Sequence, residues 1–201
     1  MCATYASEKS LEKIERFYGA RQLPQKTNFH FDREMFPGRS GLYLFHRNNE
    51  ILYTSGFWSL QYRFKRTPEI TTEYATFNAR SETVDSKETF KYPWNEGLRC
   101  VIPLNFFCEW RGEKGKKEKL AIRPQDQDTF TVAGIYEVKG HGVHSFTMLT
   151  CEPSEQMAKV HNRMPVILTD WKSWLDPKTT PAQAKEMCVP YPGLLQATKI
   201  K

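Results

Sequence analysis

The sequence of 201 residues lacks the features of membrane-spanning and disulfide-stabilised proteins. No stretch approaches the ~18 apolar residues of a membrane span, and no positively charged start leads into an apolar run. The five cysteines are an odd number without a C-x-x-C pair, which favours neither a disulfide framework nor a zinc site. We therefore expect reduced thiols, no membrane contact, no metal and no organic cofactor.

The composition is that of a globular protein with a basic surface. Hydrophobic residues make up 39% and aromatic residues 13% of the chain, which is enough for a packed core. This length favours one domain, over residues 1–201. The net charge of +6 permits an anionic partner such as nucleic acid, although a mildly basic surface often serves only solubility.

The second residue carries unusual chemical potential. If Met1 is removed, Cys2 presents a free α-amine and a thiol on adjacent carbons. The amine, with a reference pKa near ~8, is partly unprotonated at neutral pH and attacks aldehydes. The thiol then adds to the imine and closes a thiazolidine ring. This chemistry suits carbonyl capture, yet a cysteine at this position is by default only an early residue.

Short strands separated by turn residues predict an α+β fold. Apolar residues at helical spacing predict a helix over 11–21, with Ser7 as its cap. Asn48 and Asn49 predict a hairpin turn between strands 42–45 and 51–60. Further strands are expected at 99–103, 106–110, 120–123, 129–138, 145–151 and 166–168, and short helices after Pro153, at 170–175 and at 181–188. We expect a single domain with a curved, mostly antiparallel sheet or irregular β-barrel and peripheral helices.

A stretch after the second strand alternates aromatic and basic residues. Aromatic faces stack on unpaired bases and cations neutralise phosphates, as in a single-strand groove, but a half-buried strand with a solvated basic edge fits equally well. The residues are Phe57, Trp58, Tyr62 and Phe64, with Arg63, Lys65 and Arg66.

Four polar residues are candidates for a site, each with a plainer alternative. Asn78 and Arg80 offer an amide and a phosphate-binding fork, or else a turn residue and a surface cation. Glu109 lies among aromatic residues, either on the solvated face that alternation favours or in an apolar pocket with a raised pKa. His161 lies at a helix-to-strand junction before Pro165, where a histidine is structural or points into a cleft.

Five motifs in one order carry a family resemblance. Together they resemble the signature of the SRAP family, the SOS-response-associated peptidases or abasic-site-processing proteins. The resemblance spans nearly the whole chain. The motifs are Met1-Cys2, Asn78-Ala79-Arg80-Ser81-Glu82-Thr83, Arg99-Cys100 through Phe107-Cys108-Glu109-Trp110, Ala133-Gly134-Ile135-Tyr136-Glu137 and His161-Asn162-Arg163-Met164-Pro165.

The resemblance implies a lyase-like enzyme that cross-links itself to abasic sites in single-stranded DNA. Cys2 would be the nucleophile once Met1 has removed itself, the step from which the name peptidase comes. Asn78 would position the N-terminal residue or the opened sugar. Glu109 would be the general acid and base. His161 would assist at the sugar oxygen, in ring opening and in cross-link reversal.

The same resemblance implies the DNA contacts and the setting. Arg80 and Arg163 would hold phosphates, and Phe57 and Trp58 would stack on bases. The adduct would shield the lesion from strand cleavage and error-prone bypass. The protein would be a monomer whose partner is single-stranded DNA with abasic sites, and it would be cytoplasmic, at the nucleoid in a bacterium, or nuclear in a eukaryote.

Two alternatives remain open. One is a non-catalytic module that binds single-stranded nucleic acid, and Ala3-Thr4, where the family usually has Gly-Arg, removes one expected phosphate contact. The other is a thiol peptidase acting on other peptides, with Cys2, His161 and Asn78 as nucleophile, base and orienting residue.

Overall fold

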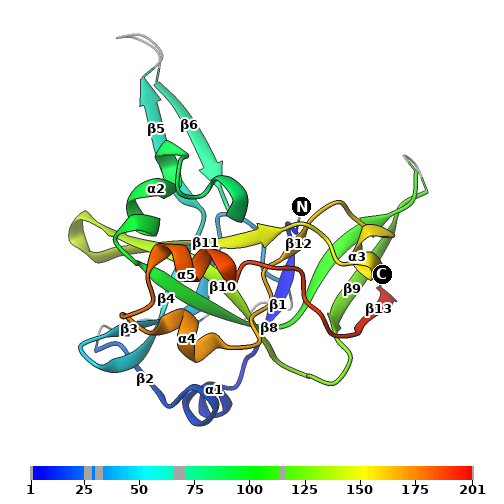
Figure 1. Ribbon diagram of the computed structural model, residues 1–201, viewed down its shortest axis with the longest axis horizontal. Helices are drawn as coiled ribbons and strands as arrows, with labels where there is room; N and C mark the ends of the chain where they lie inside the picture. The colour runs from blue at the N-terminus through cyan, green and yellow to red at the C-terminus, as the bar shows by residue number, and fades with distance from the viewer. Residues whose placement is uncertain (1, 25–28, 30–33, 66–70, 114–115, 201) are drawn as a thin grey trace.

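The computed structural model describes residues 2–24, 29, 34–65, 71–113 and 116–200. Five strands form a closed barrel (Figure 1), because β8 pairs with β3 along one edge and with β10 along the other. β4 and β11 are parallel, and the other four pairings are antiparallel. The predicted α+β class with a barrel and peripheral helices is confirmed. The barrel strands are β3 (Ser40–Arg47), β4 (Glu50–Trp58), β8 (Arg99–Arg111), β10 (Phe130–Lys139) and β11 (Val143–Cys151).

The hairpin between β3 and β4 forms at the predicted Asn-Asn turn. Asn48 and Asn49 have φ values of 52° and 61°. Positive φ at both central residues is the geometry that matches the twist of paired strands, and asparagine tolerates it well. The pairing of Arg47 with Glu50 follows directly, and it sets the register of the whole hairpin.

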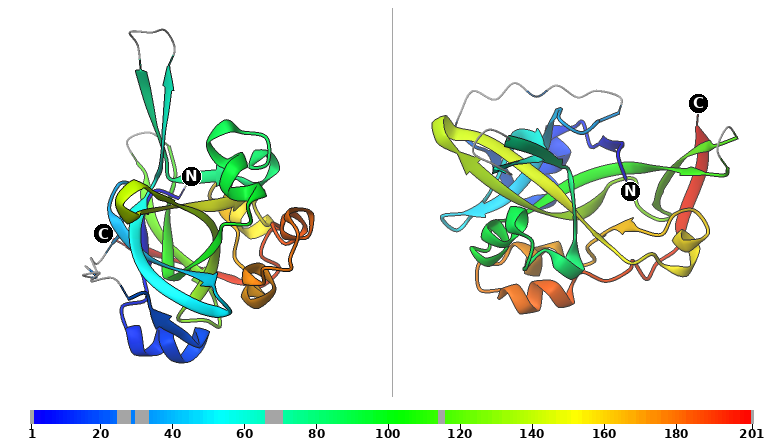
Figure 2. Two further views of the ribbon diagram at one scale, coloured as in Figure 1. Left: turned by 90° about the vertical axis from the view of Figure 1, so that its left-hand side faces the viewer. Right: turned by 90° about the horizontal axis from the view of Figure 1, so that it is seen from above.

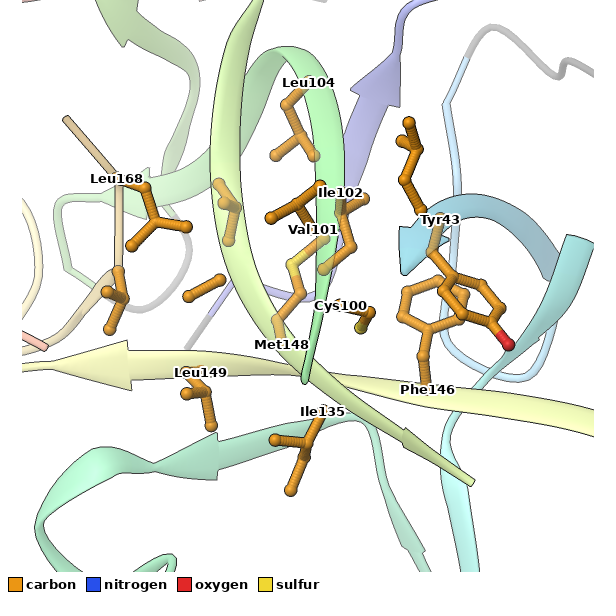
Figure 3. Close-up of a cluster of buried hydrophobic side chains, with 14 of the residues drawn as sticks. Tyr43, Cys100, Val101, Ile102, Leu104, Ile135, Phe146, Met148, Leu149 and Leu168 are labelled. Atoms are coloured by element: carbon orange, nitrogen blue, oxygen red, sulfur yellow. The ribbon is translucent and has the colours of Figure 1, made fainter. Parts of the chain in front are cut away.

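Apolar side chains from the barrel strands fill its interior (Figure 3). Val101 and Ile102 from β8, Ile135 from β10 and Met148 from β11 belong to this cluster, and all four are fully buried. Gly134 lets the strands approach this closely, since a Cβ there would lie 2.8 Å from the carbonyl oxygen of Thr147. This packing explains the glycine at that position in the sequence.

The two strands expected at 99–103 and 106–110 are one strand, β8, of 13 residues. Pro103 has no N–H to donate, but it does not interrupt the strand. Its carbonyl oxygen still accepts from the N–H of Glu8 (3.2 Å) and from the hydroxyl of Ser7 (3.1 Å). A single long strand therefore runs from Arg99 to the region of Glu109.

Additional strands extend the sheet beyond the barrel. β1 and β9 pair with β8, β13 with β9, β2 with β4, and both β7 and β12 with β11. A separate hairpin projects away from the barrel (Figures 1 and 2). Segment 166–168 is buried as predicted but forms only one isolated bridge, Val132 to Ile167, outside the named strands. The bounds are β1 (Tyr5–Ser7), β2 (Ala20–Gln22), β7 (Asn78–Arg80), β9 (Glu118–Pro124), β12 (Met164–Pro165) and β13 (Leu195–Ile200), with β5 (Leu60–Lys65) and β6 (Thr71–Thr76) in the hairpin.

Short helices cover the outside of the barrel, and α2, α4 and α5 gather on one side of it (Figure 2). The first helix is capped by Ser10 rather than Ser7, and it ends at Gly19 in the left-handed conformation. Ser154, Asp170 and Thr180 cap the last three helices. The helices are α1 (Leu11–Tyr18), α2 (Glu88–Asn95), α3 (Glu155–Ala158), α4 (Trp171–Leu175) and α5 (Pro181–Glu186), with 3-10 turns η1 (Ser81–Thr83) and η2 (Gly140–Gly142). No described helix is long and apolar enough to cross a membrane.

Candidate active site

The N-terminal strand delivers Cys2 to the far end of β8. β1 runs antiparallel to β8 with Tyr5 opposite Phe107, and the N–H of Cys108 donates to the carbonyl of Thr4 at 2.8 Å. Continuing this register toward the N-terminus places Ala3 opposite Glu109 and Cys2 one residue further along. The charge of Glu109 acts on the Cys2 thiol, so the two side chains lie close together. Cys2 is only 1% exposed, and its thiol donates to the carbonyl of Thr4 at 3.4 Å.

Glu109 is buried. The residue is 3% exposed, although its neighbour Trp110 is 52% exposed. Burial raises the pKa of Glu109 to about 7, so both protonation states are populated near neutrality. Of the two alternatives that the sequence left open, the buried position with a raised pKa is the observed one. The alternation of side chains along β8 favoured a solvated Glu109, but the N-terminal segment packs beside this part of β8. The alternation pattern of one strand carries no information about a distant segment that packs against it.

His161 reaches the same place from the turn after α3. Its N–H donates to the carbonyl of Met157 at 2.9 Å. Nδ1 of the ring accepts from the N–H of Arg163 at 3.1 Å, and Nε2 lies 3.9 Å from Oε2 of Glu109. This last distance exceeds that of a direct hydrogen bond. Burial is the main cause that lowers the pKa of His161, so the neutral ring predominates at pH 7.

Asn78 holds the main chain of the N-terminal segment. It opens β7, which pairs in parallel with β11 and places Asn78 beside Met148. Nδ2 of Asn78 donates to the carbonyl oxygen of Cys2 at 2.6 Å. Oδ1 of Asn78 is buried and accepts no hydrogen bond from a described residue. An acceptor is therefore present beside the backbone of Cys2.

The surroundings keep the Cys2 thiol protonated. Burial, followed by the nearby carboxylate of Glu109, raises the pKa of the thiol far above its usual range. Four segments distant in sequence thus meet at one place: the N-terminus, β7, the end of β8 and the turn after α3. The site contains a thiol, an amide, a neutral imidazole and a carboxyl group that is partly protonated near neutral pH. Within the described ranges, no group of three His, Cys, Asp or Glu side chains is placed to hold a metal.

Comparison with known proteins identifies the family. A family model described as SOS response associated peptidase (SRAP) matches residues 1–201. The chain belongs to the SRAP family. The abasic site processing protein YobE of Bacillus subtilis (strain 168) is 30% identical over 199 residues, which cover 95% of this chain and 90% of that protein. The abasic site processing protein HMCES of Gallus gallus is 30% identical over 139 residues, covering 56% of this chain and 41% of that one.

Solved structures share the fold. A protein from Bordetella bronchiseptica superimposes with a TM-score of 0.83 at 24% identity, covering 100% of both chains. A protein from Bacteroides thetaiotaomicron has a TM-score of 0.80 at 22% identity, covering 100% of this chain and 92% of that one. At these identities the likeness shows the SRAP fold alone.

The residues predicted to contact DNA differ in accessibility. Arg80 is exposed at the end of β7 and forms no ion pair with a described residue. Phe57 is 46% exposed. Trp58 is fully buried, its indole N–H donates to the carbonyl of Phe77 at 2.8 Å, and its ring packs against Tyr5. The expected base-stacking role of Trp58 is wrong, because a ring without exposed surface offers no stacking face. The side chains of 61–65, and Arg66, lie outside the described residues.

Arg163, for which the resemblance implied a phosphate contact, is buried. The residue is 6% exposed, and its guanidinium faces Glu82, Glu152 and the carbonyl of Thr150. The expectation of a guanidinium free to receive a phosphate is therefore corrected. Glu82 was not singled out from the sequence, although it lies within the motif 78–83. Nothing in spacing or composition pairs it with a residue 81 positions away.

Proposed function

We propose that the protein captures the aldehyde of abasic sites in single-stranded DNA and forms a covalent thiazolidine adduct through Cys2 after Met1 is removed. The observation that carries the proposal is the convergence of Cys2, Asn78 and Glu109 at one buried place, with His161 beside Glu109. The names of the relatives, abasic site processing proteins, agree with this substrate.

The reaction balances as a condensation. Hydrolysis of the Met1–Cys2 peptide bond consumes one water and frees the α-amine of Cys2. The amine adds to C1′ of the ring-opened deoxyribose, and loss of one water gives an imine. The thiol sulfur then bonds to C1′ while the thiol proton reaches the nitrogen. The product is a five-membered ring that contains both the sulfur and the nitrogen of Cys2.

The position of each side chain supports a role in this reaction. Glu109, with a pKa of about 7, gives a proton to the departing water and takes one from the thiol. Asn78 holds the carbonyl of Cys2, and its free Oδ1 is available to an N–H of the new terminus. His161 presents a neutral imidazole to the sugar oxygen, which assists ring opening. Arg80, exposed beside Asn78, is suited to a flanking phosphate.

The proposed biological role is that of a sensor and shield. A thiazolidine removes the free aldehyde from the strand, and the aldehyde is the group that promotes strand cleavage. The DNA would be single-stranded, because both the sugar and its phosphates must reach a site at the end of β8. We expect a monomer that acts wherever the DNA of the cell resides.

Incubation with a single-stranded oligonucleotide bearing one abasic site tests the proposal. We expect a band that survives denaturing electrophoresis, with a mass equal to protein lacking Met1 plus DNA minus one water. Cys2→Ser and an uncleavable N-terminal extension should both abolish it. Retardation on native gels alone would support a binding module instead, and turnover of a peptide without any adduct would support a thiol peptidase.

A further inference from the structure

The imidazole of His161 is oriented by a backbone group. The N–H of Arg163 donates to Nδ1 at 3.1 Å. A neutral ring that accepts at Nδ1 carries its hydrogen at Nε2, and Nε2 is the atom that lies 3.9 Å from Glu109. The main chain at Arg163 therefore determines which ring nitrogen faces the carboxyl group.

The side chain of Arg163 anchors this main chain. Its Nη1 and Nη2 donate to the two carboxylate oxygens of Glu82 at 2.7 and 2.8 Å. Nη1 also donates to Glu152 at 2.8 Å, and Nη2 to the carbonyl of Thr150 at 2.7 Å. The two-point contact with Glu82 fixes the plane of the guanidinium as well as its distance. The turn that carries His161 is thus fastened by a side chain that is 7% exposed.

Glu82 belongs to the segment that carries Asn78. It lies in η1, which follows β7 directly, and its carbonyl accepts from Nζ of Lys185 at 3.3 Å. Asn78 in turn holds the carbonyl of Cys2. The contact between Glu82 and Arg163 therefore connects the segment that holds the nucleophile to the segment that holds the imidazole.

We propose that Glu82 and Arg163 are a positioning pair, which keeps His161 and Asn78 in one arrangement around Cys2 and keeps the Nε2–H of His161 directed at Glu109. The inference rests on the proposed function, since it assigns a task in the same reaction. Neither residue touches the reacting atoms, and both act through the segments that they join.

A phosphate contact by Arg163 makes the opposite predictions. Phosphate binding would require the guanidinium to leave Glu82 or Glu152. Removing the charge of Glu82 would then release Arg163 and strengthen DNA binding. Removing the guanidinium of Arg163 would weaken binding to DNA of every sequence. It would also lower the dependence of DNA affinity on salt concentration by the amount of about one phosphate contact.

The test compares Glu82→Gln, Arg163→Lys and the double variant with the wild type. Asp85→Asn is the matched control, because Asp85 lies next to η1 and forms a more exposed ion pair with Lys185. Affinity is measured on an undamaged oligonucleotide, which forms no adduct. The adduct rate is measured at saturating abasic DNA from pH 5 to 9.

We expect both single variants to form the adduct at least tenfold more slowly, with DNA affinity within twofold of the wild type. Loosening the site admits water to Glu109, so the pH midpoint of the rate should move toward acid. The double variant should lose less than the product of the two single losses, because the residues act together. Asp85→Asn should match the wild type. Wild-type adduct rates in both single variants, or a loss of DNA affinity without a loss of adduct rate, would refute the positioning role of Glu82 and Arg163.

Nitrogen NMR of the imidazole gives a second measurement that needs no adduct. The wild type should show His161 as one neutral tautomer with hydrogen at Nε2, and both single variants should show a mixture. A wild type that forms no adduct refutes the proposed function, and the spectra still decide the positioning: an unchanged tautomer in folded variants overturns it. Circular dichroism verifies that each variant folds.

Discussion

Replacing Glu109 with glutamine should make the protein slower and, at alkaline pH, more stable. The pKa of Glu109 is raised from 4.5 to about 7, with burial as the largest cause. The folded protein therefore holds this proton more tightly than the unfolded chain. The stability that results is fully present below pH 4.5, is lost as the pH rises through the window from 4.5 to about 7, and is level above it.

The size of the effect follows from the width of that window. Each pH unit within it corresponds to about 1.4 kcal/mol. Between pH 5.5 and 8.5 the wild type should lose about 2 kcal/mol of unfolding free energy through this one group. Glu109→Gln has no proton to exchange, so this loss should be absent. The general acid and base is absent too, and adduct formation should slow by about 100-fold or more.

Urea denaturation at pH 5.5 and 8.5 measures the first quantity, and single-turnover adduct formation across the same range measures the second. Glu155→Gln is the control, because it makes the same chemical change at an exposed position of α3. DNA affinity should remain unchanged in Glu109→Gln, since a residue 3% exposed offers no surface to a phosphate. The same loss of stability with pH in wild type and Glu109→Gln would refute the buried carboxyl group as its source.

Four further substitutions separate binding, positioning and packing. Arg80→Ala should weaken binding to any single strand and lower the salt slope by about one contact, with an unchanged adduct rate at saturating DNA; an unchanged salt slope would contradict the phosphate contact. Asn78→Ala removes the bond to the carbonyl of Cys2 and should slow adduct formation about tenfold at constant DNA affinity, so that equal loss of both would remove its positioning role. Trp58→Ala should lower the free energy of unfolding, measured with urea, by about 3–5 kcal/mol. Phe57→Ala removes a half-exposed ring, so it should change that free energy by no more than about 1 kcal/mol and weaken binding to single strands. A larger loss of stability in Phe57→Ala than in Trp58→Ala would contradict the observed burial of the two rings.

Local patterns predicted the elements that local physics determines. The Asn48-Asn49 turn, the strands around it and the short helices begun at 170–171 and 181 are decided by residues adjacent in sequence. Closure of the barrel was only one of two options, because the pairing of β8 with both β3 and β10 joins segments far apart in the chain. Helix α2 was missed, since Pro93 inside it argues against a helix.

The site was predictable in its members but not in its contacts. Cys2 and His161 were predicted from chemistry and from the family resemblance, which also implied that they act together with Glu109, but neither gives the contacts that bring them there. Burial was the hardest property to foresee. Trp58 and Arg163 are residue types that are common on nucleic-acid-binding surfaces. In the fold, however, Trp58 packs against Tyr5 and Arg163 pairs with Glu82, so both side chains are buried. Only the fold determines which side of a strand or turn is covered.

In the proposed reaction, burial of the site determines the order of the steps. The thiol of Cys2 has a pKa raised far above neutrality by burial and by Glu109, so it is a poor first nucleophile toward an aldehyde. The α-amine, with a reference pKa near ~8, is partly unprotonated at neutral pH and attacks first. Formation of the imine then places an electrophilic carbon within ring-closing distance of the sulfur, and a carboxylate with a pKa of about 7 is matched to take the thiol proton at that moment. A free thiolate would react with any electrophile, whereas a thiol activated only after imine formation reacts with the aldehyde that the amine has already selected.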